Sequence, residues 1–431
     1  DDGDAALPAK PGTAEDGGGG GGGRAPREGE VFRNPALANT LKAVAAGGAG
    51  AYYASGSAIA SAIAQAAQRC GGCLSEQDLS EHLALGAELH DDQPISIEYR
   101  NHRIWEMPPN GQGMAALLAL QVLRGVPLTN APRFSAPSLH AIIESLRLAF
   151  ADARRCIGDL RDSEHTTARA EETRKVEELL NEGYAEQRRR LLKLSPPVAI
   201  AVSGGTPSNS SDTVYLCTAD AEGNACSFIN SNYHGFGTGI VPSGCGFTLQ
   251  NRACNFVLQP PTHVNVFAPK KRPYHTIIPG MITTASGELR YAFGVMGGFN
   301  QPQAHAQVVI NLLDYNMNVQ QALDAPRLCL QAIDHHSVAA AAAAANANGG
   351  GAAGGDERRV GRIAIEAGTR GDITPGVLQE LAAMGHNVEA DLRRGAGRSL
   401  FGNGSIIGRD PATGVLACGT DVRHDSSVVV L

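Results

Sequence analysis

The sequence changes character sharply at Asp212–Thr213, and this break constrains the fold more than any other feature. Residues 195–211 (SPPVAIAVSGGTPSNSS) contain little that could be buried and read as a surface linker. From Thr213 the strand pattern TVYLCTA, the turn DAEGN and the strand pattern ACSFINS predict a β-hairpin. A strand therefore begins directly after a segment that is open to chain cleavage.

Helical patterns dominate before this break, and strand patterns dominate after it. Helix-like patterns occur in PALANTLKAVAAGG, GSAIASAIAQAAQRC, SEQDLSEHLAL and SLHAIIESLRLAFADARRC. PPNGQGMAALLALQVLRG reads as a loop that opens a helix with apolar residues at helical spacing, whereas ISIEYRNHRIWEM reads as two strands with Arg100-Asn101-His102 as the turn. After the break come a strand in GELRYAFGV and a helix expected to begin near Gln303. This order predicts an α+β protein in which helical layers cover a mainly antiparallel sheet system.

The composition divides the 431 residues into segments. Residues 1–30, with seven consecutive glycines at Gly17–Gly23, are predicted to be disordered because they cannot bury enough surface to offset their ordering entropy. Residues 31–212 are expected to form a helical portion that ends in the linker, and residues 213–431 a strand-rich portion. The Ala/Gly-rich stretch 338–356 reads as an insertion in a loop.

Charge and cysteine content exclude several classes of protein. A net charge of -7 offers no basic field for nucleic acid, and no apolar run is long enough to span a membrane. Nine cysteines in a long chain do not suggest a disulfide framework, so reduced, buried thiols are expected. The single Cys70-Gly-Gly-Cys73 motif reads as a helix-end turn, and no metal or other cofactor is predicted.

Nucleotide binding is the first alternative, because GFGTGI contains the glycines Gly235 to Gly239. Its spacing is not that of the dinucleotide fingerprint GxGxxG, and no helix pattern follows it. This alternative is therefore disfavoured.

Thr213 can act as a nucleophile only if a base lies within reach of its hydroxyl group. Its own α-amino group could serve, since a free α-amine has a pKa of about 7.7–8.0 and is partly neutral at physiological pH. That amine does not exist until the Asp212–Thr213 bond is broken, so such an enzyme must first cleave itself.

The glycine pair Gly297-Gly298 follows a predicted strand, in FGVMGG. Backbone N–H groups without a neighbouring Cβ can point at one spot and stabilise an oxyanion. Taken separately, each feature has a structural explanation, because threonine favours strands and paired glycines favour turns.

Several long motifs occur in one order and resemble the γ-glutamyltransferase family of N-terminal-nucleophile hydrolases. DTVYLCTADAEGNACSFINSNYHGFGTGIVPSGCGFTLQN resembles the start of the family's small subunit, KKRPYHTIIPGM its substrate loop, and FGVMGG its glycine pair. WEMPPNGQGMAALLALQVLRG resembles a large-subunit segment, and the resemblance runs from about Phe32 to Leu431.

This resemblance implies a four-layer αββα sandwich and self-cleavage between Asp212 and Thr213 into two subunits that stay together. It implies attack by Thr213 on a small γ-glutamyl amide, typically glutathione, with transfer of the acyl group to water or to an acceptor amine. Ser231 matches the hydroxyl group that assists the nucleophile, and Gly297 and Gly298 match the oxyanion donors. The positions that hold the glutamyl α-amino and α-carboxylate groups match Tyr233, Arg252, Asn255, His275 and Thr276.

The sequence also departs from the family pattern. Val214 stands where another Thr is common, and His275-Thr276 replaces a serine pair. Arg252 adds a positive charge where the glutamyl ammonium group is usually bound, which leaves amides with other carboxylate groups open as substrates.

The family also has a long large-subunit segment before the equivalent of Phe32, including an arginine that grips the substrate carboxylate. This segment is missing here, so we expect either that the sequence is a fragment of a longer chain or that the protein is a divergent, inactive member. A non-catalytic relative that keeps the fold as a scaffold is therefore the second alternative.

Overall fold

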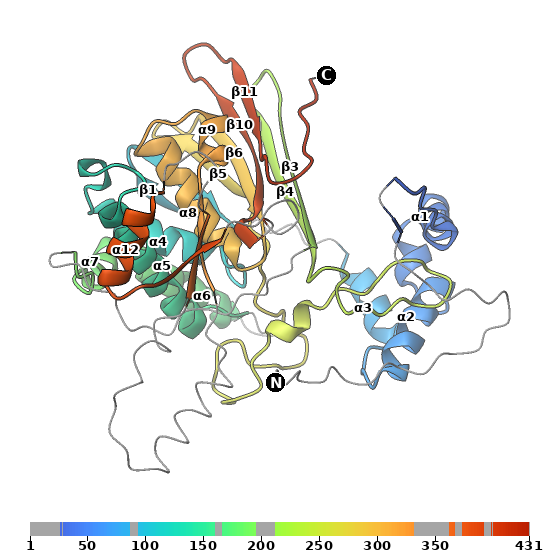
Figure 1. Cartoon of the computed structure of the whole chain (residues 1–431). Helices are drawn as coiled ribbons and strands as arrows, with labels where there is room; N and C mark the ends of the chain where they lie inside the picture. The colour runs from blue at the N-terminus through green and yellow to red at the C-terminus, as the bar shows by residue number, and fades with distance from the viewer. Residues whose placement is uncertain are drawn as a thin grey trace, which may run out of the picture. The chain divides into compact units, whose positions relative to one another are not determined.

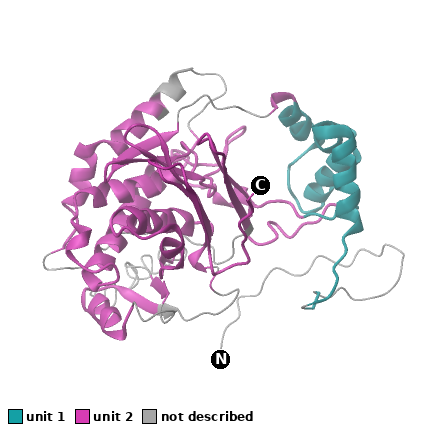
Figure 2. Cartoon of the chain, turned by 90° about the horizontal axis from the view of Figure 1, so that it is seen from above, with its two compact units in different colours: residues 1–83, 243–247 teal, residues 84–242, 248–431 magenta. Residues whose placement is uncertain are grey.

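The structure is a computed structural model that describes residues 26–27, 29–86, 94–159, 166–194, 212–331, 362–366, 373–391, 398 and 400–430. The linker 195–211, the insertion 338–356 and nearly all of the segment 1–30 lie outside these ranges. The chain forms two compact units, residues 1–83 with 243–247 and residues 84–242 with 248–431 (Figure 2). Each unit contains residues from both sides of Asp212–Thr213.

The first unit contains the helices α1 (Pro35–Tyr53), α2 (Ala58–Arg69) and α3 (Glu76–Leu85), which lie where the sequence predicted helices. Asn34 caps α1, since its side chain accepts a hydrogen bond from Leu37 N–H. The Asn34 amide also donates to the carbonyl group of Gly246, and the Thr40 hydroxyl donates to that of Cys245. These two bonds hold the segment 243–247 on α1.

The second unit is built on a six-stranded sheet in the order β1-β2-β5-β6-β10-β11. Every neighbouring pair is antiparallel, as the sequence predicted. The turn between the first two strands is shorter than expected, because His102 already pairs with Tyr99 and only Arg100 and Asn101 turn the chain. The strands are β1 (Ile95–Tyr99), β2 (His102–Glu106), β5 (Gly280–Thr284), β6 (Leu289–Met296), β10 (Asn403–Arg409) and β11 (Leu416–Thr420).

Helices pack on one face of this sheet, and the predicted hairpin packs on the other (Figure 1). The helices are α4 (Gly113–Arg124), α5 (Ala136–Cys156), α8 (Asn300–Leu313) and α9 (Val319–Asp324); α6 (Thr166–Leu180) and α7 (Glu182–Arg189) lie beside α4. The hairpin consists of β3 (Asp212–Ala219) and β4 (Ala225–Tyr233). Consecutive residues of β6 show the two faces, since Phe293 contacts His305 of α8 whereas Gly294 faces Tyr215 of β3.

A smaller sheet contains β7 (Leu328–Leu330), β8 (Arg362–Glu366) and β9 (Asn387–Asp391), with α12 (Pro375–Ala383) packed on β9. The helix α8 begins at Asn300, three residues before the expected Gln303. Its Gln303 and Gln307 side chains each pair with the backbone of β7, donating to the carbonyl groups of Leu330 and Leu328 and accepting from their N–H groups. These glutamines extend the hydrogen bonding of a short strand.

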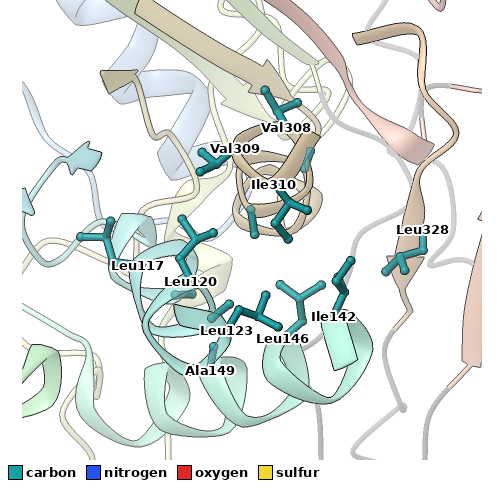
Figure 3. Close-up of a cluster of buried hydrophobic side chains, with 14 of the residues drawn as sticks. Leu117, Leu120, Leu123, Ile142, Leu146, Ala149, Val308, Val309, Ile310 and Leu328 are labelled. Carbon is teal, nitrogen blue, oxygen red and sulfur yellow. The ribbon is translucent and has the colours of Figure 1, made fainter. Parts of the chain in front are cut away.

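The main core fills the space between α4, α5 and α8 (Figure 3). Its side chains come from apolar positions at helical spacing, which the sequence already indicated for α4 and α5. Its completely buried members include Leu117, Leu120, Leu123, Ile142 and Leu146.

All nine cysteines are free, in line with the expectation of reduced thiols. The expectation that they are buried is wrong for most of them, because only Cys245 and Cys329 are buried and Cys70, Cys73, Cys226, Cys254 and Cys418 are exposed. Within the described ranges, no helix is both long and apolar enough to cross a membrane.

Replacing Ile142 with Ala should leave a cavity between α4, α5 and α8 and lower the free energy of unfolding by about 2–5 kcal/mol. Urea unfolding followed by circular dichroism measures this change. The control is Leu191→Ala, whose side chain is 45% exposed and should change stability little. Equal effects of the two substitutions would contradict the core described above.

Candidate active site

The position of Thr213 follows from how the hairpin packs on β6. A Cβ atom at Gly294 would overlap the ring of Tyr215, so the absence of a side chain lets the two strands approach closely. Thr213 lies two residues before Tyr215 and on the same face of β3. Cys217 contacts Ile407, which pairs with Ala292 of β6, whereas Tyr215 lies on Gly294 further along β6. Going back along β3 therefore means going forward along β6. Thr213 accordingly lies toward the end of β6 that leads into Gly297.

Thr213 and Ser231 face each other across the hairpin. The Thr213 hydroxyl donates to the Ser231 hydroxyl oxygen at 3.0 Å, and Tyr233 N–H donates to the same oxygen at 2.8 Å. The pairing register shifts between Asp212 and Thr213, which makes an irregularity at the predicted cleavage position. Tyr233 itself has a positive φ of 77°. The structure thus brings together Thr213, Ser231 and Tyr233 from the sequence prediction.

Arg252 extends this cluster toward the substrate-loop motif. Its guanidinium group donates to the Thr276 hydroxyl oxygen at 2.7 Å and to the Ser231 carbonyl oxygen at 3.3 Å. It also lies over the Tyr233 ring, with 5.5 Å between its central carbon and the ring centroid. Burial lowers the pKa of Arg252 from its usual value, and burial raises that of Tyr233. A cation with neutral neighbours therefore lies beside the candidate nucleophile.

Gln112 connects this cluster to the glycine pair. Its completely buried side-chain amide donates to the carbonyl oxygens of Thr276 and Gly298, both at 2.8 Å. Gly297 and Gly298 have φ values of 137° and 55°, which favour glycine. A chain of direct contacts thus runs from Thr213 to Gly298.

Asn255 and His275 make contacts of a different kind. The Asn255 amide donates to the Tyr274 carbonyl oxygen at 3.1 Å, so it fixes the backbone next to His275. His275 Nδ1 lies 2.7 Å from the Pro273 carbonyl oxygen and 2.9 Å from the Asn110 side-chain nitrogen. Burial, with smaller contributions from Arg252 and Arg272, lowers the pKa of His275 to about 4, so its imidazole is neutral at physiological pH.

A cavity of about 780 Å³ lies beside this cluster. It is bordered by the β4 residues Ser227 to Ile229, by the loop Met107–Gly111 and by His275. Its other walls, from β1, α6 and the segment leading into β5, are mainly apolar and include Ile95, Val176, Leu180, Ile277 and Pro279. Of the site residues named from the sequence, His275 lines this cavity, so the room for an apolar group lies beside the polar cluster and not at Thr213 itself.

Gln112 was not identified as a site residue from the sequence. The motif PPNGQGM marked a loop that opens a helix, and Gln112 does precede α4. Its two carbonyl partners lie 164 and 186 residues further along the chain, so no local pattern could reveal its role.

Within the part of the chain that the structure describes, one group of side chains has the spacing of metal ligands: His140, Glu144 and His386. His140 Nε2 donates to the Lys193 carbonyl oxygen, which leaves its Nδ1 to accept from His386 Nε2 at 2.7 Å. His386 Nδ1 then accepts from Arg147, whose cation also pairs with Glu144 at 2.6 Å. Because each imidazole lone pair has a donor and a buried cation is present, these residues do not fit a metal ion.

Comparison with known proteins identifies the family of this chain. The family model described as gamma-glutamyltranspeptidase matches residues 19–431. The chain belongs to the gamma-glutamyltranspeptidase family. A glutathione hydrolase-like proenzyme (YwrD) of Bacillus subtilis is 32% identical over 305 residues, which cover 70% of this chain and 54% of the relative. An oxamate amidohydrolase proenzyme of Klebsiella pneumoniae is 29% identical over 405 residues, which cover 94% of this chain and 66% of the relative.

The crystal structure of a cephalosporin acylase from Bacillus halodurans superposes with a TM-score of 0.74 at 37% identity, covering 94% of this chain and 64% of the acylase. This confirms the predicted fold class, the α+β, four-layer αββα sandwich of N-terminal-nucleophile hydrolases. The chain thus spans between about half and two thirds of the length of these gamma-glutamyltranspeptidase relatives.

The imidazole of His275 should remain neutral down to about pH 5. Its pKa falls from 6.5 in the unfolded chain to about 4 in the folded protein, so the unfolded chain takes up this proton first. The contribution of His275 to stability is therefore complete above about pH 6.5 and is lost as the pH falls from about 6.5 to about 4. NMR titration of its ring protons, assigned with His275→Asn, measures the pKa. A midpoint near 6.5 would contradict the buried position.

Proposed function

We propose that this chain is an N-terminal-nucleophile amidohydrolase whose nucleophile, Thr213, becomes available when the Asp212–Thr213 bond is cut. The observation that supports this most directly is the Thr213–Ser231 hydroxyl contact of 3.0 Å, on the hairpin face that leads toward Gly297-Gly298. The names of the relatives, two of which are proenzymes, agree with a chain that is processed.

Cleavage would begin with attack of the Thr213 hydroxyl oxygen on the carbonyl carbon of Asp212. The C–N bond breaks as the C–O bond forms, and the hydroxyl proton passes to the departing nitrogen. Water then hydrolyses the resulting ester, which yields the Asp212 carboxylate and a Thr213 with a free hydroxyl and a free amine. Ser231, hydrogen-bonded to the Thr213 hydroxyl, would orient it for this attack.

Turnover of an amide would use the same hydroxyl. The α-amine of Thr213 accepts the hydroxyl proton while the oxygen attacks the substrate carbonyl. The N–H groups of Gly297 and Gly298 would stabilise the oxyanion, and Gln112 holds the backbone on the carbonyl side of Gly298. The leaving amine takes the proton back, and the acyl-threonine ester passes to water or to an acceptor amine.

The proposed substrate is a small amide with a carboxylate group, either a γ-glutamyl amide such as glutathione or a related compound. Relatives named glutathione hydrolase-like proenzyme and oxamate amidohydrolase proenzyme support this range. Arg252, Tyr233 and Thr276 would contact the polar part of the substrate. The cavity beside His275 offers space for an apolar part, in agreement with the similarity to a cephalosporin acylase. The partner of the Thr213 fragment would be the other fragment of the same precursor.

A non-catalytic scaffold is the competing proposal. The buried polar chain through Arg252 and Gln112 speaks against it, because buried polar groups cost stability unless they are paired and a scaffold could replace them with apolar groups. Nucleotide binding at Gly235–Gly239 has no support, since the described residues that follow form turns and loops up to a short 3-10 helix at Arg252.

Cleavage should replace the 431-residue chain by two fragments of nearly equal length, residues 1–212 and 213–431, which run close together on a denaturing gel, and the fragment 213–431 should begin Thr-Val-Tyr-Leu. Thr213→Ala removes the attacking hydroxyl and should give a single uncut band, whereas Thr213→Ser keeps the hydroxyl and should still be cleaved. Time courses of band intensity and N-terminal sequencing measure this. A wild-type chain that stays uncut, like the Thr213→Ala variant, would favour the proposal of a non-catalytic scaffold.

Cleaved wild type should release p-nitroaniline from a γ-glutamyl or other carboxylate-bearing p-nitroanilide. Ser231→Ala should lower kcat/KM by roughly 10–100-fold, because it removes a hydrogen bond to the nucleophile. Absorbance of released nitroaniline, normalised to the cleaved fraction, measures the rate. Full activity of Ser231→Ala would show that this contact is not used in turnover.

A further inference from the structure

Arg252 is a buried cation that has no acidic partner in the described part of the chain. Its side chain donates to the Thr276 hydroxyl and the Ser231 carbonyl group and lies over the Tyr233 ring, and all three are neutral. Only 4% of its surface is exposed. A buried charge is costly unless an opposite charge or several hydrogen bonds compensate it, and a cation–π contact offsets only part of that cost.

Other buried arginines in the described ranges have compensation that Arg252 lacks. Arg147 pairs with Glu144 at 2.6 Å, Arg327 pairs with Asp421 at 2.6 Å, and Arg423 pairs with Glu366. Arg133, by contrast, forms no ion pair with the described residues. It binds the Asn311 side chain near the C-terminal end of α8, however, where Asp314 and the helix carbonyl groups favour a positive charge.

Among the described residues around Arg252, burial raises the pKa values of the Tyr233 and Cys254 side chains, so neither supplies the missing negative charge at physiological pH. His275 is neutral at physiological pH, and Arg252 itself helps to lower its pKa. The neighbouring Asn255 amide is already bonded to the Tyr274 carbonyl group. The charge near Arg252 is therefore left for a ligand to balance.

The place of Arg252 relative to the nucleophile indicates which part of a ligand would bind there. Its guanidinium group contacts the carbonyl group of Ser231, whose hydroxyl contacts the Thr213 hydroxyl. A carboxylate on Arg252 would therefore lie only a few bonds from a carbonyl carbon attacked by Thr213. Arginine presents several N–H donors in a planar fork that matches a carboxylate.

We infer that Arg252 is the specificity residue of this site and that it binds a carboxylate on the acyl part of the substrate, close to the amide carbonyl group. This inference rests on the proposed function and narrows it. The preferred substrates are amides of short dicarboxylic acids, and the acyl part needs no ammonium group. A γ-glutamyl amide is a weaker substrate than an amide with the same carboxylate and no amine, because its ammonium group is repelled by the guanidinium.

Matched chromogenic probes test this inference on the cleaved 431-residue chain. The pair is succinyl p-nitroanilide and its methyl ester, in which one methyl group replaces the negative charge. Wild type should turn over the free acid with a kcat/KM at least about 10-fold above that of the ester. Arg252→Gln should bring the ratio of the two kcat/KM values close to one, mainly through a higher KM for the acid.

Two further variants distinguish the effect of the Arg252 charge from a nonspecific effect of substitution on the fold. Arg252→Lys keeps the cation but loses the fork, so it should retain part of the preference for the acid. Arg103→Gln removes an exposed arginine whose partner is the exposed Glu98, and it should leave the preference unchanged. If Arg252→Gln fails to fold or to be cleaved, inhibition of wild type replaces it: succinate should compete with the probe, and neutral succinamide should not.

Equal rates of wild type with acid and ester, or an unchanged preference in Arg252→Gln, would overturn the inference while leaving the amidohydrolase intact. Equal inhibition by succinate and succinamide would overturn it as well. Turnover of neither probe nor any γ-glutamyl anilide by wild type, together with an uncut chain, would instead contradict the proposed function itself.

Discussion

The close approach of Tyr215 to Gly294 is the contact on which the arrangement of the site depends. Because residue 294 has no Cβ atom, the hairpin can lie directly on β6. The period of two along β3 then directs Thr213 toward the end of that strand, where the chain turns at Gly297 and Gly298. A side chain at position 294 would separate the two layers and would move the candidate nucleophile away from the glycine turn.

Polar side chains rather than apolar ones then connect the parts of the site. Gln112 and Arg252 each join two segments that are far apart in the sequence, and both are buried. The buried side-chain amide of Asn300, beside the glycine turn, has no hydrogen-bond partner among the residues that the structure describes. Such groups lower stability, so a fold keeps them where they do something that an apolar core cannot. Their concentration next to Thr213 agrees with a site that recognises a polar ligand.

Much of the fold could be predicted because its signals are local. Helical spacing predicted α4 and α5, alternation predicted β3 and β4, and the motifs predicted the family. The details that failed depend on neighbours. The first turn is two residues long because His102 pairs with Tyr99, α8 begins three residues early at Asn300, and most thiols are exposed rather than buried. Hydrogen-bond partners and exposure are properties of the packed chain.

The sequence by itself indicated which residues could carry the chemistry: a threonine after a cleavable linker and two glycines after a strand, to which the family resemblance added Ser231. It could do so because strand patterns, turns and family motifs are properties of the order of residues along the chain. Only the tertiary structure decided that Arg252 is buried with no acidic partner among the described residues, that His275 is neutral and that Gln112 joins Thr276 to Gly298. Those properties depend on desolvation and on contacts between residues far apart in the chain, which no local pattern contains.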